Sequence, residues 1–301
     1  MKVIKVSPRG YCKGVVRAIN LVKEARNTYE GPIYILGLIV HNTFVKAALE
    51  EYHIITLDTS KKSKESYLNE INEGIIIFTA HGVSKKIYEL ANKPNVKYID
   101  ASCLDVLKTQ QLIKQKHDDG YTILYIGKKN HPEAEAVVNS FDNIHLIHSK
   151  DDIDALSSNL NKLYITNQTT MSIYDTKELI SYIKSKYPHA EFDLEICDAT
   201  KIRQEAIMQV NADVLIVVGD KLSNNSNKLL ELNKNITRKY MINCVSDINV
   251  SWFTPEDTIA VTSGASTPTY LTNQVINYLE QLDISDESTH LKPSVEISKI
   301  L

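Results

Sequence analysis

The sequence predicts an α/β protein of three similar modules, each with a small and mostly parallel sheet. Two observations lead to this fold class. Short apolar runs alternate along the whole chain with segments of helical apolar spacing, as they do where strands and helices alternate. In addition, three cysteines recur in one local setting at nearly equal distances. A repeat of that length indicates that one α/β unit occurs three times.

The strand-like runs each end in a polar or glycine-containing loop. They are continuous in apolar residues, which is typical of parallel strands that are buried on both faces and connected by helices. The runs are KVIKV, IYILG, IIIFTA, VKYID, TILYIG, KLYIT, DVLIVVGD and TIAVTSG. In such folds the functional groups lie just past the carboxyl ends of the strands, so a site is expected in the loops that follow these runs.

Three of the four cysteines lie between a strand-like run and a segment of helical spacing. Cys12 is in IKVSPRGYCKGVVRAI, Cys103 in KYIDASCLDVLKTQ and Cys197 in FDLEICDATKIRQEAI, and they are 91 and 94 residues apart. Cys244, in YMINCVSDI, lacks this setting, and we expect it to be a core residue of a strand.

The cysteine spacing also suggests where the modules begin and end. We expect the first module at residues 13–102, the second at 103–196, and the third at 197–283 together with 1–12. The polar segment 284–301 is expected to be a mobile tail.

Composition excludes several classes of protein. The chain of 301 residues has a net charge of -3, so its overall charge does not favour nucleic acid or an anionic membrane as a partner. The N-terminal MKVIKVSPRG lacks the apolar core of a signal peptide, and the runs GIIIF and VLIVVG are too short to span a bilayer. The cysteines include no close pair of the kind found in secreted disulfide frameworks. We therefore expect a cytoplasmic protein.

Cysteines at the starts of helices can bind a metal cluster. Free backbone N–H groups and the positive end of the helix dipole lower the pKa of a thiol there. Three such thiols suit an iron-sulfur cluster, and on a four-iron cluster they would leave one iron open to a substrate oxygen. Zinc is the main alternative, although structural zinc usually has four protein ligands. Thiols that merely fill the core are the other alternative.

Polar residues follow several of the predicted strands. Histidines occupy this position in GLIVHNTF (His41), FTAHGVS (His81) and IGKKNHPEAE (His131). Hydroxyl and amide side chains crowd the stretches GDKLSNNSNK (219–228) and TSGASTPT (262–269). They are either turns and helix caps or a site for phosphate oxygens. Since neither GxxxxGK nor GxGxxG occurs, we expect a small phosphorylated or diphosphorylated ligand rather than an ordinary nucleotide.

A carboxyl group also follows one of these histidines. Glu133 lies two residues beyond His131, and TNQTTMS adds Gln168, Thr169 and Thr170. Beside a metal centre a carboxyl group is a natural proton donor, and the amide and hydroxyls could orient or relay the proton. A solvated surface glutamate and a capped turn are the structural alternatives.

Nine motifs occur in order between residues 2 and 280: PRGYCKGVVRAI, GLIVHN, TAHGVS, DASCLDV, HPEAE, NQTTMS, EICDAT followed by IRQ, VVGDKLSNNSN and VTSGAST. In this set the chain resembles the 4-hydroxy-3-methylbut-2-enyl diphosphate reductase (LytB) family of oxidoreductases, which catalyses the last step of the non-mevalonate isoprenoid pathway. Nine collinear motifs make the resemblance highly specific.

The resemblance implies a trefoil of three α/β modules around a central [4Fe-4S] cluster, with Cys12, Cys103 and Cys197 as its ligands. It implies that Glu133 is the proton donor and that Thr169 helps to fix the substrate hydroxyl. The residues implied in diphosphate binding are His41, His81, His131, Ser223, Asn224, Asn225 and Ser266.

The resemblance also implies the reaction. The substrate hydroxyl binds the open iron, two electrons from an external donor of the ferredoxin or flavodoxin type expel it as water, and protonation gives isopentenyl and dimethylallyl diphosphate. The chain departs from the common family pattern at Leu104, Asn130, Ala136 and Asn224, which stand where many members have proline, glycine, glycine and serine. None of these departures removes a ligand or the acid.

Other functions fit part of the pattern. A quinolinate-synthase-like dehydratase also uses three cysteines and three modules, but the phosphate-type loops and HPE argue against it. A non-catalytic iron-sulfur sensor would hold a cluster without turnover, and a zinc-bound structural protein would hold no iron.

Overall fold

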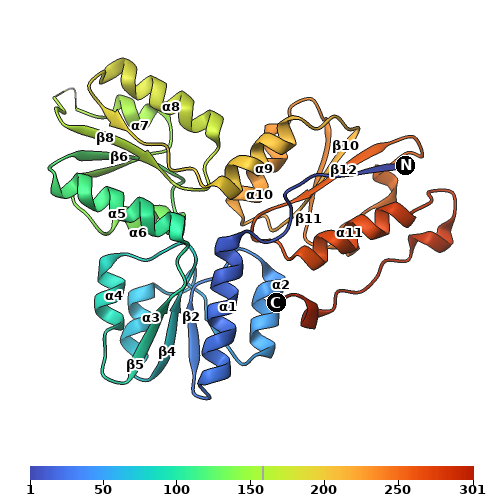
Figure 1. The fold of residues 1–301 in the computed structure, drawn as a ribbon, viewed down its shortest axis with the longest axis horizontal. Coiled ribbons are helices and arrows are strands. Elements are labelled where there is room, and N and C mark those ends of the chain that lie inside the picture. The colour runs from blue at the N-terminus through green and yellow to red at the C-terminus, as the bar shows by residue number, and fades with distance from the viewer. Residues whose placement is uncertain (158) are drawn as a thin grey trace. The chain divides into compact units, whose positions relative to one another are not determined.

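The computed structural model describes residues 1–157 and 159–301. In this part of the chain the strands form three four-stranded sheets, and every pair of neighbouring strands is parallel (Figure 1). The predicted α/β class with three small parallel sheets is therefore confirmed.

One sheet has the strand order β3-β2-β4-β5. Its strands are β2 (Ile33–Leu36), β3 (Ile55–Leu57), β4 (Gly74–Phe78) and β5 (Val96–Asp100), and the helices along this part of the chain are α1 (Lys13–Thr28), α2 (Thr43–Glu51), α3 (Lys64–Glu70) and α4 (Lys85–Ala91). All five residues of β4 are buried, as expected for a central strand with an unbroken apolar run.

A second sheet has the order β7-β6-β8-β9. It consists of β6 (Thr122–Ile126), β7 (Ile144–Ile147), β8 (Leu163–Asn167) and the two-residue β9 (Glu191–Phe192), with helices α5 (Leu104–Asp118), α6 (Pro132–Val138), α7 (Lys150–Asp154) and α8 (Ile173–Lys186). The core on one side of this sheet contains Leu124, Ile165 and Ile183.

The third sheet has the order β1-β12-β10-β11. It combines β1 (Lys2–Lys5) with β10 (Val214–Val218), β11 (Arg238–Ile242) and β12 (Thr258–Ser263), and its helices are α9 (Asp198–Met208), α10 (Asn224–Leu232) and α11 (Thr269–Gln281). In the other two sheets the strand order is second, first, third and fourth along the chain. The third sheet has the same order, β11-β10-β12-β1, with the N-terminal β1 in the position of the fourth strand. The N-terminal strand thus completes a sheet made from the C-terminal third of the chain.

The chain divides into two compact units. Unit 1 comprises residues 1–16, 40–52 and 198–301, and unit 2 comprises 17–39 and 53–197. The third sheet belongs to unit 1, and the other two sheets belong to unit 2. The boundaries expected for the three modules stay a prediction.

The predicted runs correspond closely to strands. Each of the eight runs overlaps one strand, whereas β3, β7, β9 and β11 lie outside the runs. Cys244 is buried as expected but lies just past the end of β11 rather than within a strand. Among the helices in the described part of the chain, none combines the length and the apolar character that a bilayer crossing requires.

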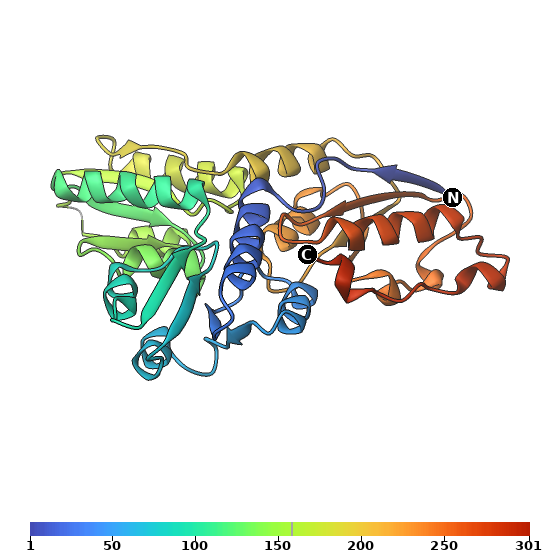
Figure 2. The same ribbon diagram turned by 60° about the horizontal axis from the view of Figure 1, so that its bottom comes forward.

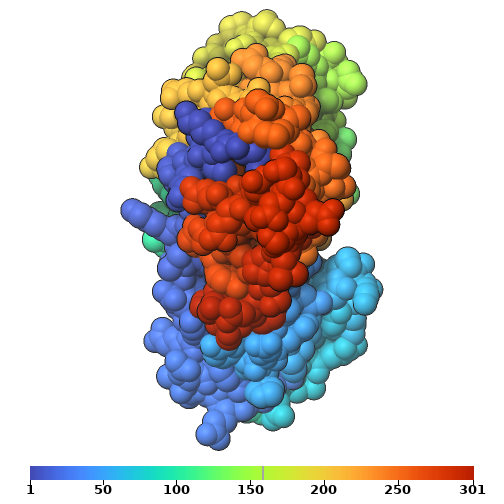
Figure 3. Space-filling model, turned by 90° about the vertical axis from the view of Figure 1, so that its right-hand side faces the viewer, coloured from blue at the N-terminus to red at the C-terminus, as the bar shows by residue number. Residues whose placement is uncertain are grey.

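Residues 284–301 run back along α11 (Figure 2), and the C-terminal part of the chain, in red, forms a continuous patch on the face shown in Figure 3. Tyr278 donates to the backbone oxygen of His290, and Gln274 donates to that of Ser294. Near the end of the segment, the Tyr11 hydroxyl donates to the carbonyl of Ile300 at 3.0 Å, and only 2% of Ile300 is exposed. The mobility expected for this segment stays a prediction, which these contacts make testable.

We expect Ile300→Asp to lower the melting temperature by several degrees, because it places a carboxylate in a buried apolar site at a cost of about 2 kcal/mol or more. Leu291→Asp is the matched control, since Leu291 in the same segment is 87% exposed. Differential scanning calorimetry measures both. Equal melting of Ile300→Asp and the wild type would show that the segment is a mobile tail after all.

Candidate functional site

Each of the three predicted ligands is the residue directly before a helix. Cys12 precedes α1, Cys103 precedes α5 and Cys197 precedes α9. The carbonyl of Cys12 accepts the N–H of Val16, and that of Cys103 accepts the N–H of Leu107, so both carbonyls belong to the first helical turn. All four cysteines of the chain carry thiols, and these three are partly exposed. The expected position at a strand-to-helix corner is observed for all three.

The same backbone hydrogen bond holds each of these cysteines. The N–H of Cys12 donates to the carbonyl of Ala265 at 3.0 Å, that of Cys103 to Ala80 at 2.9 Å, and that of Cys197 to Thr169 at 3.0 Å. In every case the acceptor lies two residues beyond the last residue of a strand, namely β12, β4 and β8. These are topologically equivalent strands of the three sheets.

The turn before Cys12 depends on a glycine. Gly10 has φ +76°, and a Cβ atom there would lie 2.2 Å from the hydroxyl oxygen of Thr269. The Gly10 N–H donates to the Ser263 hydroxyl at 2.7 Å, and Arg203 donates to the Gly10 carbonyl at 2.7 Å. No other residue type would fit this conformation and this close approach without strain.

Unit 2 buries the carboxyl group of Glu133. The residue belongs to the first turn of α6 and is 2% exposed. Its Oε1 accepts the N–H of Thr169 at 2.7 Å, and its Oε2 accepts the Thr169 hydroxyl at 3.0 Å. The Tyr125 hydroxyl donates to Oε1 at 3.4 Å. Glu133 is therefore not the solvated surface residue that its local sequence also allowed.

Burial raises the pKa of Glu133 to about 7, because the charged carboxylate loses its hydration. The hydrogen bonds from Thr169 and Tyr125 favour the charged form and oppose this effect, whereas the negative charge of Asp105 adds to it. A carboxyl group with this pKa is present in both protonation states near neutral pH, as general acid catalysis requires.

Two of the predicted histidines lie near the start of α6, the helix that carries Glu133. His131 caps α6, and its Nδ1 accepts the N–H of Glu133 at 3.2 Å. The rings of His131 and His81 meet edge to face with centroids 5.4 Å apart. Unit 2 thus brings together Glu133, Thr169, His81 and His131.

Unit 1 brings together most of the predicted phosphate ligands. Ser223 caps α10, and its hydroxyl accepts from that of Ser266 at 3.4 Å. The Ser266 hydroxyl is also 3.3 Å from the carbonyl of His41. Asn225 accepts the N–H of Ala265 at 3.2 Å and donates to Thr200 at 3.2 Å. Asn224 is the first residue of α10 and is buried.

Two glycines keep this region compact. A Cβ atom at Gly219 or Gly264 would lie 2.3 or 2.1 Å from the hydroxyl oxygen of Ser226. The loops after β10 and β12 can therefore approach the start of α10 closely. A helix N-terminus with capping hydroxyls and amides is suited to bind an anion.

The departures from the family pattern are accommodated locally. Asn130 adopts φ +61°, a conformation that asparagine tolerates better than most residues. Ala136 lies inside α6, where alanine is favourable. Leu104 is the exposed first residue of α5.

Some neighbours of the site escaped sequence reasoning. Tyr125 and Asp105 act on Glu133, and Thr200 bonds to Asn225. Tyr125 resembles an ordinary residue of a buried strand, so no signal in the sequence pointed to its contact with Glu133. Of the residues predicted to orient or relay a proton, Gln168 accepts the N–H of Lys128 and donates to Thr170.

Known proteins are similar to this chain over nearly its whole length. The family model described as LytB protein matches residues 3–280. A protein of Bacillus pumilus (strain SAFR-032), named 4-hydroxy-3-methylbut-2-enyl diphosphate reductase, is 48% identical over 100% of this chain and 98% of its own length. One of the same name from Bacillus subtilis (strain 168) is 45% identical with the same coverage.

A solved structure is also similar. The E-1-hydroxy-2-methyl-but-2-enyl-4-diphosphate reductase from Plasmodium falciparum has a TM-score of 0.87 and 34% identity, covering 94% of this chain and 89% of that one. The family model spans nearly the whole sequence, and full-length relatives share almost half of its residues. The chain therefore belongs to the LytB protein family.

Proposed function

We propose that the chain reduces 4-hydroxy-3-methylbut-2-enyl diphosphate to isopentenyl and dimethylallyl diphosphate, with loss of the hydroxyl group as water. The observation that carries this proposal is the similarity over the full chain to proteins named 4-hydroxy-3-methylbut-2-enyl diphosphate reductase. The buried Glu133 carboxyl, held by Thr169, supports it chemically.

The proposed cofactor is a [4Fe-4S] cluster bound by Cys12, Cys103 and Cys197. The donor set fits: three partly exposed thiols begin three helices and are fixed by equivalent backbone bonds. Sulfur is the preferred ligand of such clusters. When bound, the cluster would supply single electrons and an iron with an open coordination position.

The proposed diphosphate ligands are polar side chains. In unit 1 these are His41, Ser223, Asn224, Asn225 and Ser266, close to the N-terminus of α10, where backbone N–H groups favour an anion. In unit 2 they are His81 and His131.

Glu133 would deliver the proton. Because burial raises its pKa to about 7, the carboxyl group can carry a proton near neutral pH and act as a general acid. Thr169 would orient both this carboxyl and the substrate hydroxyl. The electrons would come from a separate donor of the ferredoxin or flavodoxin type, since the sequence contains no GxGxxG dinucleotide motif. The cytoplasmic location expected from the sequence stays a prediction.

Glu133→Gln should lower the rate of substrate consumption about 100-fold or more, because the amide cannot donate an acidic proton. The assay uses anaerobic, cluster-reconstituted protein with an artificial reductant, at iron content equal to that of the wild type. Glu135→Gln is the matched control, since Glu135 is exposed on the same helix. A wild-type protein that holds the cluster but consumes no substrate would contradict the proposed reaction and favour the sensor alternative.

The rate should fall as the pH rises through about 7, because the donor must be protonated. Thr169→Val removes a hydrogen bond that favours the carboxylate of Glu133, so the pKa of Glu133 should rise. The fall in rate should then occur at a higher pH than in the wild type. Thr170→Val is the control on the neighbouring hydroxyl. A fall in rate at lower pH in Thr169→Val than in the wild type would contradict the assignment of Glu133 as the proton donor.

Ser223→Ala should change the ratio of the two products, because we expect the diphosphate pocket to influence where the allyl carbon is protonated. Ser223→Thr keeps both the hydroxyl and the cap of α10 and should restore the wild-type ratio. The measurement is the ratio of the two five-carbon diphosphates. An unchanged ratio in Ser223→Ala would count against an influence of the diphosphate pocket on the site of protonation.

A further inference from the structure

The segment before Cys197 lies along the end of β8. Residues 193–197, the Cys197 strap, connect β9 to α9, and alternate N–H groups of the strap bond to successive acceptors. Asp193 donates to the carbonyl of Ile165 at 3.1 Å, and Cys197 donates to that of Thr169 at 3.0 Å. Between them, Glu195 donates to a side chain, the Oδ1 of Asn167, at 3.0 Å. The strap is therefore attached to β8 and to the loop that follows it.

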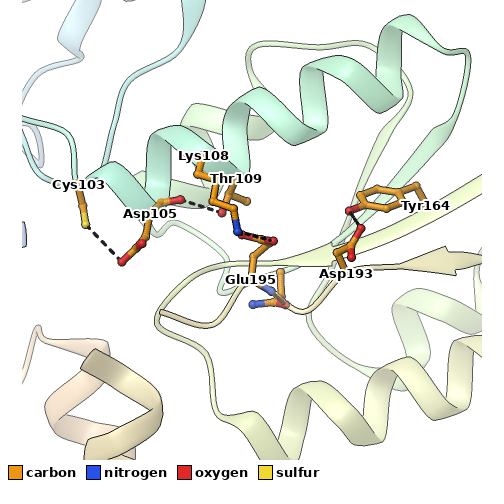
Figure 4. Close-up of polar contacts among 8 residues, drawn as sticks. Cys103, Asp105, Lys108, Thr109, Tyr164, Asp193 and Glu195 are labelled. Carbon is orange, nitrogen blue, oxygen red and sulfur yellow. Dashed lines mark hydrogen bonds and ion pairs between the residues drawn. The ribbon is translucent and has the colours of Figure 1, made fainter. Parts of the chain in front are cut away.

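A second attachment comes from the helix that begins after Cys103. Lys108 of α5 donates to both carboxylate oxygens of Glu195, at 3.3 and 3.2 Å (Figure 4). The two residues are 87 positions apart in the sequence. Lys108 is five residues beyond Cys103, and Glu195 is two residues before Cys197. The contact thus joins two cysteine-bearing segments of unit 2.

We propose that the Lys108–Glu195 ion pair is a positioning contact that fixes Cys197 relative to Cys103 before any cofactor binds. The proposal rests on the proposed function, in which both cysteines are ligands of one cluster. Preorganised ligands bind more tightly, because less conformational freedom is lost on binding.

The burial of the two side chains supports a role beyond a surface pair. The side chain of Lys108 is 70% exposed, whereas that of Glu195 is only 12% exposed. Removal of Lys108 leaves a largely buried carboxylate without its cation, which favours displacement of the strap toward solvent. At the α5 end of the contact, the Thr109 hydroxyl donates to the carbonyl of Asp105 within the helix (Figure 4).

The test uses Lys108→Met, Glu195→Gln and the charge-reversed double variant Lys108→Glu/Glu195→Lys. The first measurement is hydrogen exchange of the strap in the full-length apoprotein. The second is the rate at which a chelator removes iron from the reconstituted protein. Because Lys108 is largely exposed, water weakens the pair, so we expect strap exchange and iron loss to rise about threefold in each single variant. The double variant should return both rates toward wild type, since it restores the opposite charges.

Lys114→Met is the matched control. Lys114 also lies on α5 and also pairs with an acid, but its partner Asp118 belongs to the same helix. Its removal should leave the strap unchanged. Wild-type exchange in Lys108→Met, or faster exchange that the double variant does not reverse, would overturn the proposal. The apoprotein measurement is independent of cluster and turnover, so a failure of the proposed reaction would be seen separately.

Discussion

One backbone hydrogen bond, made three times, anchors the proposed cofactor site. Each of the three cysteines donates its N–H to a carbonyl two residues past the end of an equivalent strand. The acceptors belong to Ala265, Ala80 and Thr169, so the bond does not depend on the acceptor's side chain. It fixes the start of a helix against the carboxyl edge of a sheet, where α/β proteins carry their functional groups. The sequences around it can vary while the thiol keeps its place.

Thr169 links this anchor to the proposed acid. Its carbonyl accepts the N–H of Cys197, and its N–H and hydroxyl both donate to Glu133. A displacement of the loop after β8 would therefore affect a proposed ligand and the proposed proton donor together. Because burial raises the pKa of Glu133 and the hydrogen bonds from Thr169 lower it, small movements of this loop should change that pKa.

The parts of the fold that follow from local pattern were predictable, and those that follow from tertiary packing were not. The run VLIVVG is unmistakable because a central strand buried on both faces must be apolar throughout. In contrast, β3 and β7 are short edge strands with exposed residues, and their sequences resemble loops. The corner positions of the cysteines follow from sequence alone, but the burial of Glu133 does not, because the groups that cover it come from β6 and the loop after β8.

The pairing of β1 with β12 has a consequence for the order in which the protein matures. β1 is an edge strand that pairs with β12, and the carbonyl that accepts the N–H of Cys12 is that of Ala265. During synthesis the N-terminus leaves the ribosome first, and domains generally fold as units once they are complete. The first cysteine to be translated is therefore the last to be anchored. Loading of a cofactor that needs all three anchored thiols must then wait until the chain has been made at least as far as Ala265.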